Sequence, residues 1–146
     1  MPRHDDETVL DQLVLIRAIR QDWITIENNR ERLTSAAFKD GSLEASCFIS
    51  EEVGGNEGFE RNILPLLEEE FARIATIVAE AVREGGLWIY RKPEEFYGNA
   101  AHVVICPSDG MTKSRYARET GRLKDRASLV EPADNAIRPA DENRRN

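Results

Sequence analysis

The amino-acid sequence predicts an α+β protein in which a small mixed or antiparallel sheet packs on one long amphipathic helix, with a basic C-terminal helix in addition. Short runs of β-branched and aromatic residues predict the strands. A long apolar repeat predicts the main helix, and a segment dense in lysine and arginine predicts the second. A chain of 146 residues with 40% hydrophobic content can build one core, so we expect a single domain.

The N-terminal part of the chain predicts a short helix followed by a strand. Apolar residues from Leu10 to Ile19 form a broad face that favours a helix started by Asp5 or Asp6, and a strand over Leu13 to Ile16 is the alternative. Trp23 to Ile26 is typical of a strand, which the turn formers that follow it should end.

The middle of the chain predicts a strand and then a loop. Residues alternate in character from Ala45 to Ser50, as expected of a strand with two different faces. Glu51 to Gly58 contains three glycines and three acids, which predicts a flexible surface loop. This segment lacks the Gly-Lys-Ser/Thr ending of a phosphate-binding loop, and its charge repels phosphate.

The clearest periodicity runs from Asn62 to Glu84 and predicts the core helix. Asn62 can cap it, Pro65 falls in its first turn, and Gly85-Gly86 should end it. Its apolar side chains recur at spacings of three and four and form one stripe: Leu64, Leu67, Phe71, Ile74, Val78 and Ala81.

The remaining elements complete the predicted domain. Leu87 to Tyr90 and Ala101 to Cys106 read as strands, and the second is apolar on both faces and therefore central. A basic helix is predicted from Thr112 to Ala127. We expect the sheet to include the segments near Trp23, Leu33, Cys47, Leu87 and Val103.

The domain boundaries follow from composition. We expect a flexible N-terminus over residues 1–8, one α+β domain over 9–130, and a disordered tail over 131–146, where prolines and charges replace apolar residues.

The net charge and the cysteine content limit the cellular compartment and the classes of binding partner that we expect for this protein. A net charge of -7 and a pI near 5.0 disfavour binding to nucleic acid or anionic membranes by the chain as a whole. No secretory signal or membrane-spanning run is evident, so we expect a cytoplasmic protein without membrane contact. In a reducing compartment Cys47 and Cys106 are expected to be buried thiols rather than a disulfide.

One short segment, Arg30 to Asp40, concentrates cations and hydroxyls around a single aromatic residue. Arg30, Arg32, Thr34 and Ser35 could hold a phosphate or carboxylate through charge-assisted hydrogen bonds. The alternative is an edge strand with solvated arginines, where exposed ion pairs contribute little.

His102 is the second candidate because it begins the strongest predicted strand, which would hold the imidazole on a rigid support. It could act as a general base or contact a ligand, and the alternative is a buried histidine bonded to a backbone carbonyl. Neither His102 nor His4 has partners at the usual ligand spacing, so we expect no metal and no other cofactor.

The segment from Lys113 to Arg126 carries a local charge of +4. On a helix these cations could bind an acidic protein partner, or they could be a solvated face paired with the protein's own acids. The partner-binding candidates are Lys113, Arg115, Arg118 and Arg122.

Scattered patches between Leu13 and Val104 resemble a family of small uncharacterised bacterial proteins. They comprise Leu15-Ile16-Arg17-Ala18-Ile19, Trp23-Ile24, Arg32-Leu33-Thr34-Ser35-Ala36-Ala37-Phe38-Lys39-Asp40, Ser46, and Ala101-His102-Val103-Val104. In that family an arginine, paired hydroxyls and Ala-Phe come early and Ala-His comes late, and Thr34 stands here where serine is expected. The resemblance implies a small cytoplasmic bacterial protein of unknown activity. A more distant similarity is to NAD-directed toxin domains, whose acidic catalytic residue has no evident counterpart here.

These observations leave two functional hypotheses. The first is a binding or accessory protein that recognises an anionic ligand through Arg30, Arg32, Ser35 and His102, or an acidic partner through the basic helix. The second is an enzyme acting on a nucleotide-like or other phosphate-containing small molecule. In that case His102 would be the acid or base, Ser35 would lie near the reacting group, and Arg32 would bind the phosphate. The second hypothesis requires Ser35 and His102 to share a pocket.

Overall fold

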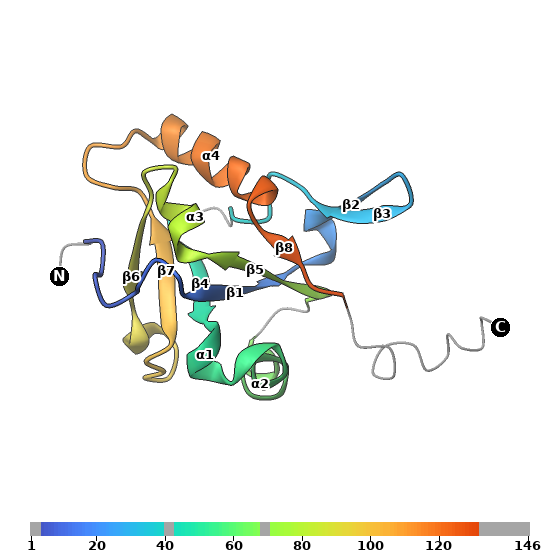
Figure 1. Ribbon diagram of the computed structural model, residues 1–146, viewed down its shortest axis with the longest axis horizontal. Coiled ribbons are helices and arrows are strands. Elements are labelled where there is room, and N and C mark those ends of the chain that lie inside the picture. Colours follow the sequence, from blue (N-terminus) through green and yellow to red (C-terminus); the bar gives the residue numbers. More distant parts are fainter. Residues whose placement is uncertain (1–3, 40–42, 68–70, 132–146) are drawn as a thin grey trace.

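The computed structural model describes residues 4–39, 43–67 and 71–131 and is built on a six-stranded antiparallel sheet with the order β6-β7-β4-β1-β5-β8 (Figure 1). A separate hairpin pairs β2 with β3. The strands are β1 Val14–Ile19, β2 Ile24–Glu27, β3 Arg30–Leu33, β4 Ala45–Ile49, β5 Arg73–Val78, β6 Trp88–Arg91, β7 His102–Cys106 and β8 Ser128–Leu129. The helices are α1 Ser50–Val53, α2 Gly55–Asn62, α3 Ala79–Arg83 and α4 Lys113–Arg122, with short 3₁₀ turns η1 Gln21–Trp23, η2 Leu64–Leu66, η3 Pro93–Glu95 and η4 Leu123–Asp125. The expected α+β class and the antiparallel sheet are confirmed.

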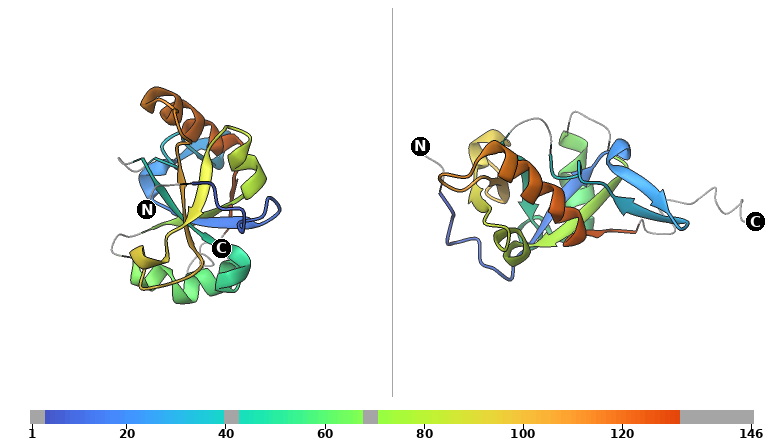
Figure 2. Two further views of the ribbon diagram at one scale, coloured as in Figure 1. Left: turned by 90° about the vertical axis from the view of Figure 1, so that its left-hand side faces the viewer. Right: turned by 90° about the horizontal axis from the view of Figure 1, so that it is seen from above.

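The sheet buries apolar residues on both faces. On the first face α3 and α4 pack through residues such as Val82 and Tyr116. On the second face α1 and α2 lie against the sheet, and Phe59 of α2 is fully buried there (Figures 1 and 2). Cys47 and Cys106 are both buried thiols, as expected, because they lie on the interior strands β4 and β7, each of which has a neighbour on both sides.

The predicted helix over Leu10 to Ile19 is wrong, and the alternative strand is closer to the structure. Val14–Ile19 forms β1, which pairs with β4 on one side and β5 on the other. The strand forms because a position between two other strands buries both faces of an apolar, β-branched run, and tertiary pairing outweighs a weak helical pattern.

The long helix predicted from Asn62 to Glu84 is also wrong. The described part of that range contains η2, β5 and the short helix α3, and residues 68–70 lie outside the described residues. The β-branched run from Ile74 to Val78 favours a strand, and pairing with all six residues of β1 stabilises it. The predicted end of the helix is nevertheless close, since α3 stops just before Gly86, which has a φ of 82°.

The predicted loop from Glu51 to Gly58 forms helix instead. α1 and α2 follow each other directly and are separated by Gly54, whose φ of 90° lets the chain turn between them. Phe59 anchors this pair of helices to the second face of the sheet through an edge-on contact with Phe48, at a centroid distance of 5.7 Å. Burial of one aromatic residue therefore outweighs the glycine content of the segment.

Two of the segments expected in the main sheet form the separate hairpin. β2 and β3 are joined by Asn28 and Asn29, both of which have a positive φ, and project from the end of the molecule opposite β6 and β7 (Figure 1). The strand predicted over Ala101 to Cys106 is confirmed as β7, whose five residues are all buried between β6 and β4. The basic helix is confirmed as α4, capped by the Thr112 hydroxyl.

Arg17 is an unusual core residue, since only 4% of it is exposed. β1 and β4 pair only through Leu15 with Ile49 and Ile16 with Phe48, so the ladder stops before it reaches Ser46. Beyond this point the Arg17 guanidinium, instead of a backbone amide of β1, donates the hydrogen bond to β4. It donates from Nη1 to the Ser46 carbonyl at 2.9 Å and from Nε to the Ala37 carbonyl at 2.8 Å.

The same guanidinium lies over two aromatic rings. Its central carbon is 5.0 Å from the Trp23 ring centroid and 5.7 Å from that of Phe38. These contacts keep the charge in a polarisable environment and fix the segment around Ala37 to the first face of the sheet.

Replacing Arg17 with methionine should lower the free energy of unfolding by about 2 to 4 kcal/mol, because the buried Ala37 carbonyl and the part-buried Ser46 carbonyl would lose their donor. Urea unfolding followed by circular dichroism measures this change. Arg118→Met on the exposed face of α4 is the matched control and should change stability by less than about 0.5 kcal/mol. Equal stability of the Arg17 and Arg118 variants would contradict the assigned role.

Candidate functional site

The structure places His102 on the second face of the sheet, with only 3% of its surface exposed. Its backbone lies directly opposite Phe48 in the β4–β7 ladder. The imidazole is enclosed by Phe48, at a centroid distance of 5.0 Å, and by Phe96, which stacks on it at 5.9 Å with an interplanar angle of 28°. The apolar enclosure makes the two ring nitrogens depend on protein partners.

Both ring nitrogens have such partners. His102 Nδ1 lies 2.8 Å from the Lys92 carbonyl oxygen, and Nε2 lies 2.6 Å from the Ser46 hydroxyl. A carbonyl oxygen can only accept, so Nδ1 carries the proton in the neutral ring and Nε2 offers its lone pair. The Ser46 hydroxyl therefore donates to Nε2. This is the arrangement in which a histidine acts as general base toward a serine.

Ser46 differs from its neighbours in β4 because it is exposed while the other four residues of the strand are buried. It shares a sheet face with Phe48, two residues further along the strand. Its carbonyl is held by Arg17 from the first face, and its hydroxyl is held by His102 on the second. Both the main chain and the side chain of Ser46 are thus held in place, and the side chain is still accessible to a small molecule.

A charged network surrounds Lys92, whose carbonyl orients His102. The Lys92 ammonium lies 2.7 Å from Glu44 and 2.6 Å from Glu95. Burial of the ammonium disfavours its charge, but the hydrogen bonds to the two carboxylates outweigh burial and raise the pKa of Lys92 well above its usual value. Glu44 also accepts a hydrogen bond from the Tyr90 hydroxyl, whose pKa is raised by burial and by this carboxylate. The network fixes η3 and β4 relative to each other.

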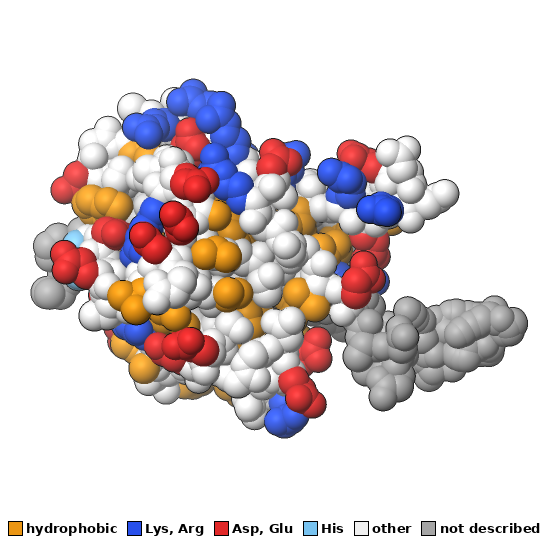
Figure 3. All heavy atoms as spheres, in the orientation of Figure 1, with side chains coloured by type: hydrophobic (Ala, Val, Ile, Leu, Met, Phe, Trp, Pro, Cys, Tyr) orange, Lys and Arg blue, Asp and Glu red, His pale blue; other side chains and the backbone are white. Residues whose placement is uncertain are grey.

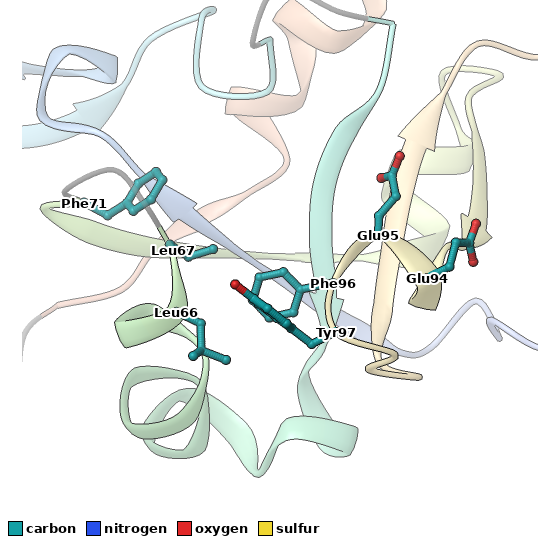
Figure 4. Close-up of a pocket in the computed structure, with 7 residues that line it drawn as sticks. All are labelled: Leu66, Leu67, Phe71, Glu94, Glu95, Phe96 and Tyr97. Carbon is teal, nitrogen blue, oxygen red and sulfur yellow. The ribbon is translucent and has the colours of Figure 1, made fainter.

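A pocket of about 730 Å³ lies on the same side of the molecule (Figure 4). Its walls come from the segment between α2 and β5, and from η3 and the loop that follows it (Figure 4). Phe96 belongs both to the pocket wall and to the enclosure of His102. The lining residues are Leu66, Leu67, Phe71, Glu94, Glu95, Phe96 and Tyr97.

The candidates Ser35 and His102 are not brought together. A side chain added at Gly121 of α4 would meet the Ser35 β-carbon at 3.5 Å and the Lys39 ammonium at 3.4 Å, which places Ser35 beside α4. The neighbouring Ala37 and Phe38 belong to the core of the first face, whereas His102 packs against Phe48 on the second. The sheet therefore separates the two residues.

The other candidates from the same segment also lie away from His102. Arg30 and Arg32 are exposed on β3, and Arg32 pairs with Glu27 across the hairpin. The Thr34 hydroxyl is bonded to the Trp23 carbonyl at 3.1 Å, so it supports the loop. These residues do not form one site with His102 in the described part of the chain.

The basic helix presents cations to solvent. Lys113, Arg115 and Arg118 are exposed and form no ion pair with any described residue, whereas Arg122 pairs with the buried Glu119. Lysine and arginine side chains gather over α4 in the space-filling view (Figure 3). This surface lies on the face of the sheet opposite His102.

Sequence reasoning did not select Ser46 as a candidate, although the resemblance included it. The available signal was its place as a hydroxyl in an otherwise apolar strand, Ala45–Ile49. Its partnership with His102 depends on the β4–β7 register across 56 residues of chain, which one sequence does not reveal.

Comparison with protein-family models, curated proteins and solved structures found no match to this chain. Among the described residues, no group of three or more His, Cys, Asp or Glu side chains is placed to hold a metal ion. No helix in the described ranges has the length and apolar character needed to cross a membrane.

Proposed function

We propose that this protein is a small hydrolase of carboxylic esters, with Ser46 as the nucleophile and His102 as the general base. The observation that carries the proposal is the 2.6 Å contact between the Ser46 hydroxyl and His102 Nε2, with Nδ1 held by the Lys92 carbonyl. The exposure of Ser46 and the neighbouring pocket of about 730 Å³ support it, since the volume is typical of sites for small molecules.

The proposed reaction has two stages. Ser46 Oγ attacks the ester carbonyl carbon while its proton moves to His102 Nε2, and the proton then passes to the departing alcohol as the carbon–oxygen bond breaks. Water attacks the resulting acyl-serine and gives a proton to Nε2. The bond from Ser46 Oγ to the acyl carbon breaks, Oγ recovers the proton, and the carboxylic acid leaves. One ester and one water thus give one acid and one alcohol.

The contacts around His102 suit this role because they hold the imidazole in a single tautomer before the substrate arrives. In serine hydrolases a carboxylate commonly orients the base, and here a backbone carbonyl takes that place. The carbonyl is itself fixed, because the Lys92 amide donates to the His102 carbonyl at 2.9 Å. Little reorganisation is then needed during proton transfer.

Ser46→Ala and His102→Gln should each lower the rate of hydrolysis of 4-nitrophenyl acetate by on the order of 10²-fold or more, because each removes one partner of the proton transfer. Release of 4-nitrophenolate, followed by absorbance with purified full-length protein, measures the rate. Ser128→Ala on the exposed face of β8 is the control and should leave the rate unchanged. Wild-type activity in the Ser46→Ala protein would overturn the proposal. A loss seen only in Ser35→Ala would instead favour the site expected from the sequence.

A second candidate function is binding of an acidic protein partner through α4. The observation that favours it is the group of three exposed cations, Lys113, Arg115 and Arg118, that pair with no described side chain. A helix surface of this kind attracts carboxylates at low salt. The two functions are compatible because they use opposite faces of the sheet.

Replacing Lys113, Arg115 and Arg118 together with alanine should weaken binding of a fluorescent oligoglutamate peptide by about tenfold or more at low salt. Fluorescence anisotropy in 50 and 200 mM salt measures the affinity and its salt dependence. Arg61→Ala on α2, whose side chain pairs with Glu57, is the control and should bind as the wild type does. Unchanged affinity in the triple variant would exclude α4 as the binding surface.

A further inference from the structure

We infer that the pocket beside His102 recognises organic cations, so that the preferred substrates are esters of alkylammonium or quaternary ammonium alcohols. This inference rests on the proposed function where it speaks of substrates, and on the pocket alone where it speaks of binding. Three features of the pocket carry it: an aromatic pair, a strained residue at its rim, and an acidic side.

The aromatic pair is Phe96 and Tyr97. Their rings meet edge to face, at a centroid distance of 5.1 Å and an angle of 77°, and together form two walls of the pocket (Figure 4). Phe71 lies across from them, with Leu66 and Leu67 nearby (Figure 4). The faces of aromatic rings carry a negative potential, so aromatic walls attract an alkylated ammonium group that packs against them.

Tyr97 occupies a conformation that a non-glycine residue rarely adopts. Its φ is 56°, it is followed by Gly98 with a φ of 71°, and 77% of the residue is exposed. A large aromatic residue exposed in left-handed backbone costs free energy without the compensation of core burial. Strain of this kind concentrates at sites that bind ligands, and here it presents the ring to the pocket.

The acidic side consists of Glu94 and Glu95. Glu95 is paired with Lys92, but Glu94 is exposed and has no ion-pair or hydrogen-bond partner among the described residues. The Lys92 ammonium is also paired with Glu44, so two carboxylates already neutralise it and Glu94 adds a further negative charge. The excess negative charge next to the aromatic walls selects a cation over a neutral or anionic ligand.

The pocket is coupled to the proposed nucleophile through Phe96. This ring stacks on His102, and His102 contacts the Ser46 hydroxyl. A ligand whose ammonium group sits against Phe96 and Tyr97 therefore lies on the side of the sheet from which Ser46 is accessible. The alcohol part of the ester would occupy the pocket and the carbonyl would extend toward Ser46.

The binding test uses the full-length Ser46→Ala protein, which cannot turn over an ester by the proposed route. Benzyltrimethylammonium and its uncharged isostere neopentylbenzene are titrated, and chemical-shift changes report affinity. We expect the cation to bind at least fivefold more tightly. Glu94→Gln and Tyr97→Leu should each weaken cation binding by about threefold to tenfold, with little change for the isostere. Glu57→Gln on α2 is the control and should change neither affinity.

The catalytic test compares hexanoylcholine with 3,3-dimethylbutyl hexanoate, its uncharged isostere, in the wild type and in Glu94→Gln. The wild type should favour the choline ester in kcat/KM, and Glu94→Gln should remove most of that preference. Equal binding of the charged and uncharged probes, or tighter binding of benzenesulfonate, would overturn the inference.

The inference and the proposed function fail in different ways. If Ser46→Ala hydrolyses esters as fast as the wild type while the cation preference in binding persists, the proposed function fails and the ligand class stands. If Ser46→Ala is inactive but charged and uncharged esters react equally in the wild type, only the ligand class fails.

Discussion

The arrangement of the candidate site depends on one constraint, which is that a buried imidazole needs partners for both of its nitrogens. His102 sits among Phe48 and Phe96 and is only 3% exposed, so in the resting protein its nitrogens are bonded to protein groups. The Lys92 carbonyl accepts from Nδ1, and this choice leaves Nε2 as the acceptor for Ser46. The β4–β7 register and the position of η3 must both be correct for these two contacts to form together. The hydrogen bonds that define the candidate site therefore depend directly on the backbone geometry of β4, β7 and η3.

The same need for a hydrogen-bond partner explains the position of Arg17 on the other face of the sheet. Where the ladder between β1 and β4 ends, its guanidinium supplies the donor that the Ser46 carbonyl would otherwise lack. Ser46 is thus the residue at which two buried basic side chains meet, one through the main chain and one through the hydroxyl. A serine held in this way keeps its side chain in one orientation, which favours reaction at Oγ over a purely structural hydroxyl. The further support from Glu44, Lys92 and Glu95 links this residue to the pocket wall.

Composition and local pattern were sufficient for the α+β class, for β7 and for α4, because an apolar run buried on both faces and a capped cationic helix have distinct local signatures. They were insufficient for β5, where Ile74 and Val78 match a helical spacing as well as a strand, and only pairing with β1 distinguishes the two. They were also insufficient for the site. His102 could be selected because histidine is rare in this chain. Its partner Ser46 could not be selected, because the sequence alone does not distinguish Ser46 from Ser35. Only the folded sheet shows that the two serines lie on different sides.

We propose that the Ser46 oxygen is activated by His102 and accessible from solvent. Reaction of the full-length protein with a fluorophosphonate, followed by mass spectrometry of the intact protein and its peptides, tests this claim directly, because such reagents phosphonylate activated serines. We expect a single adduct on the peptide that contains Ser46, formed in the wild type and lost in His102→Gln. The absence of an adduct in the wild type, or an adduct on Ser46 that forms equally fast without His102, would contradict it.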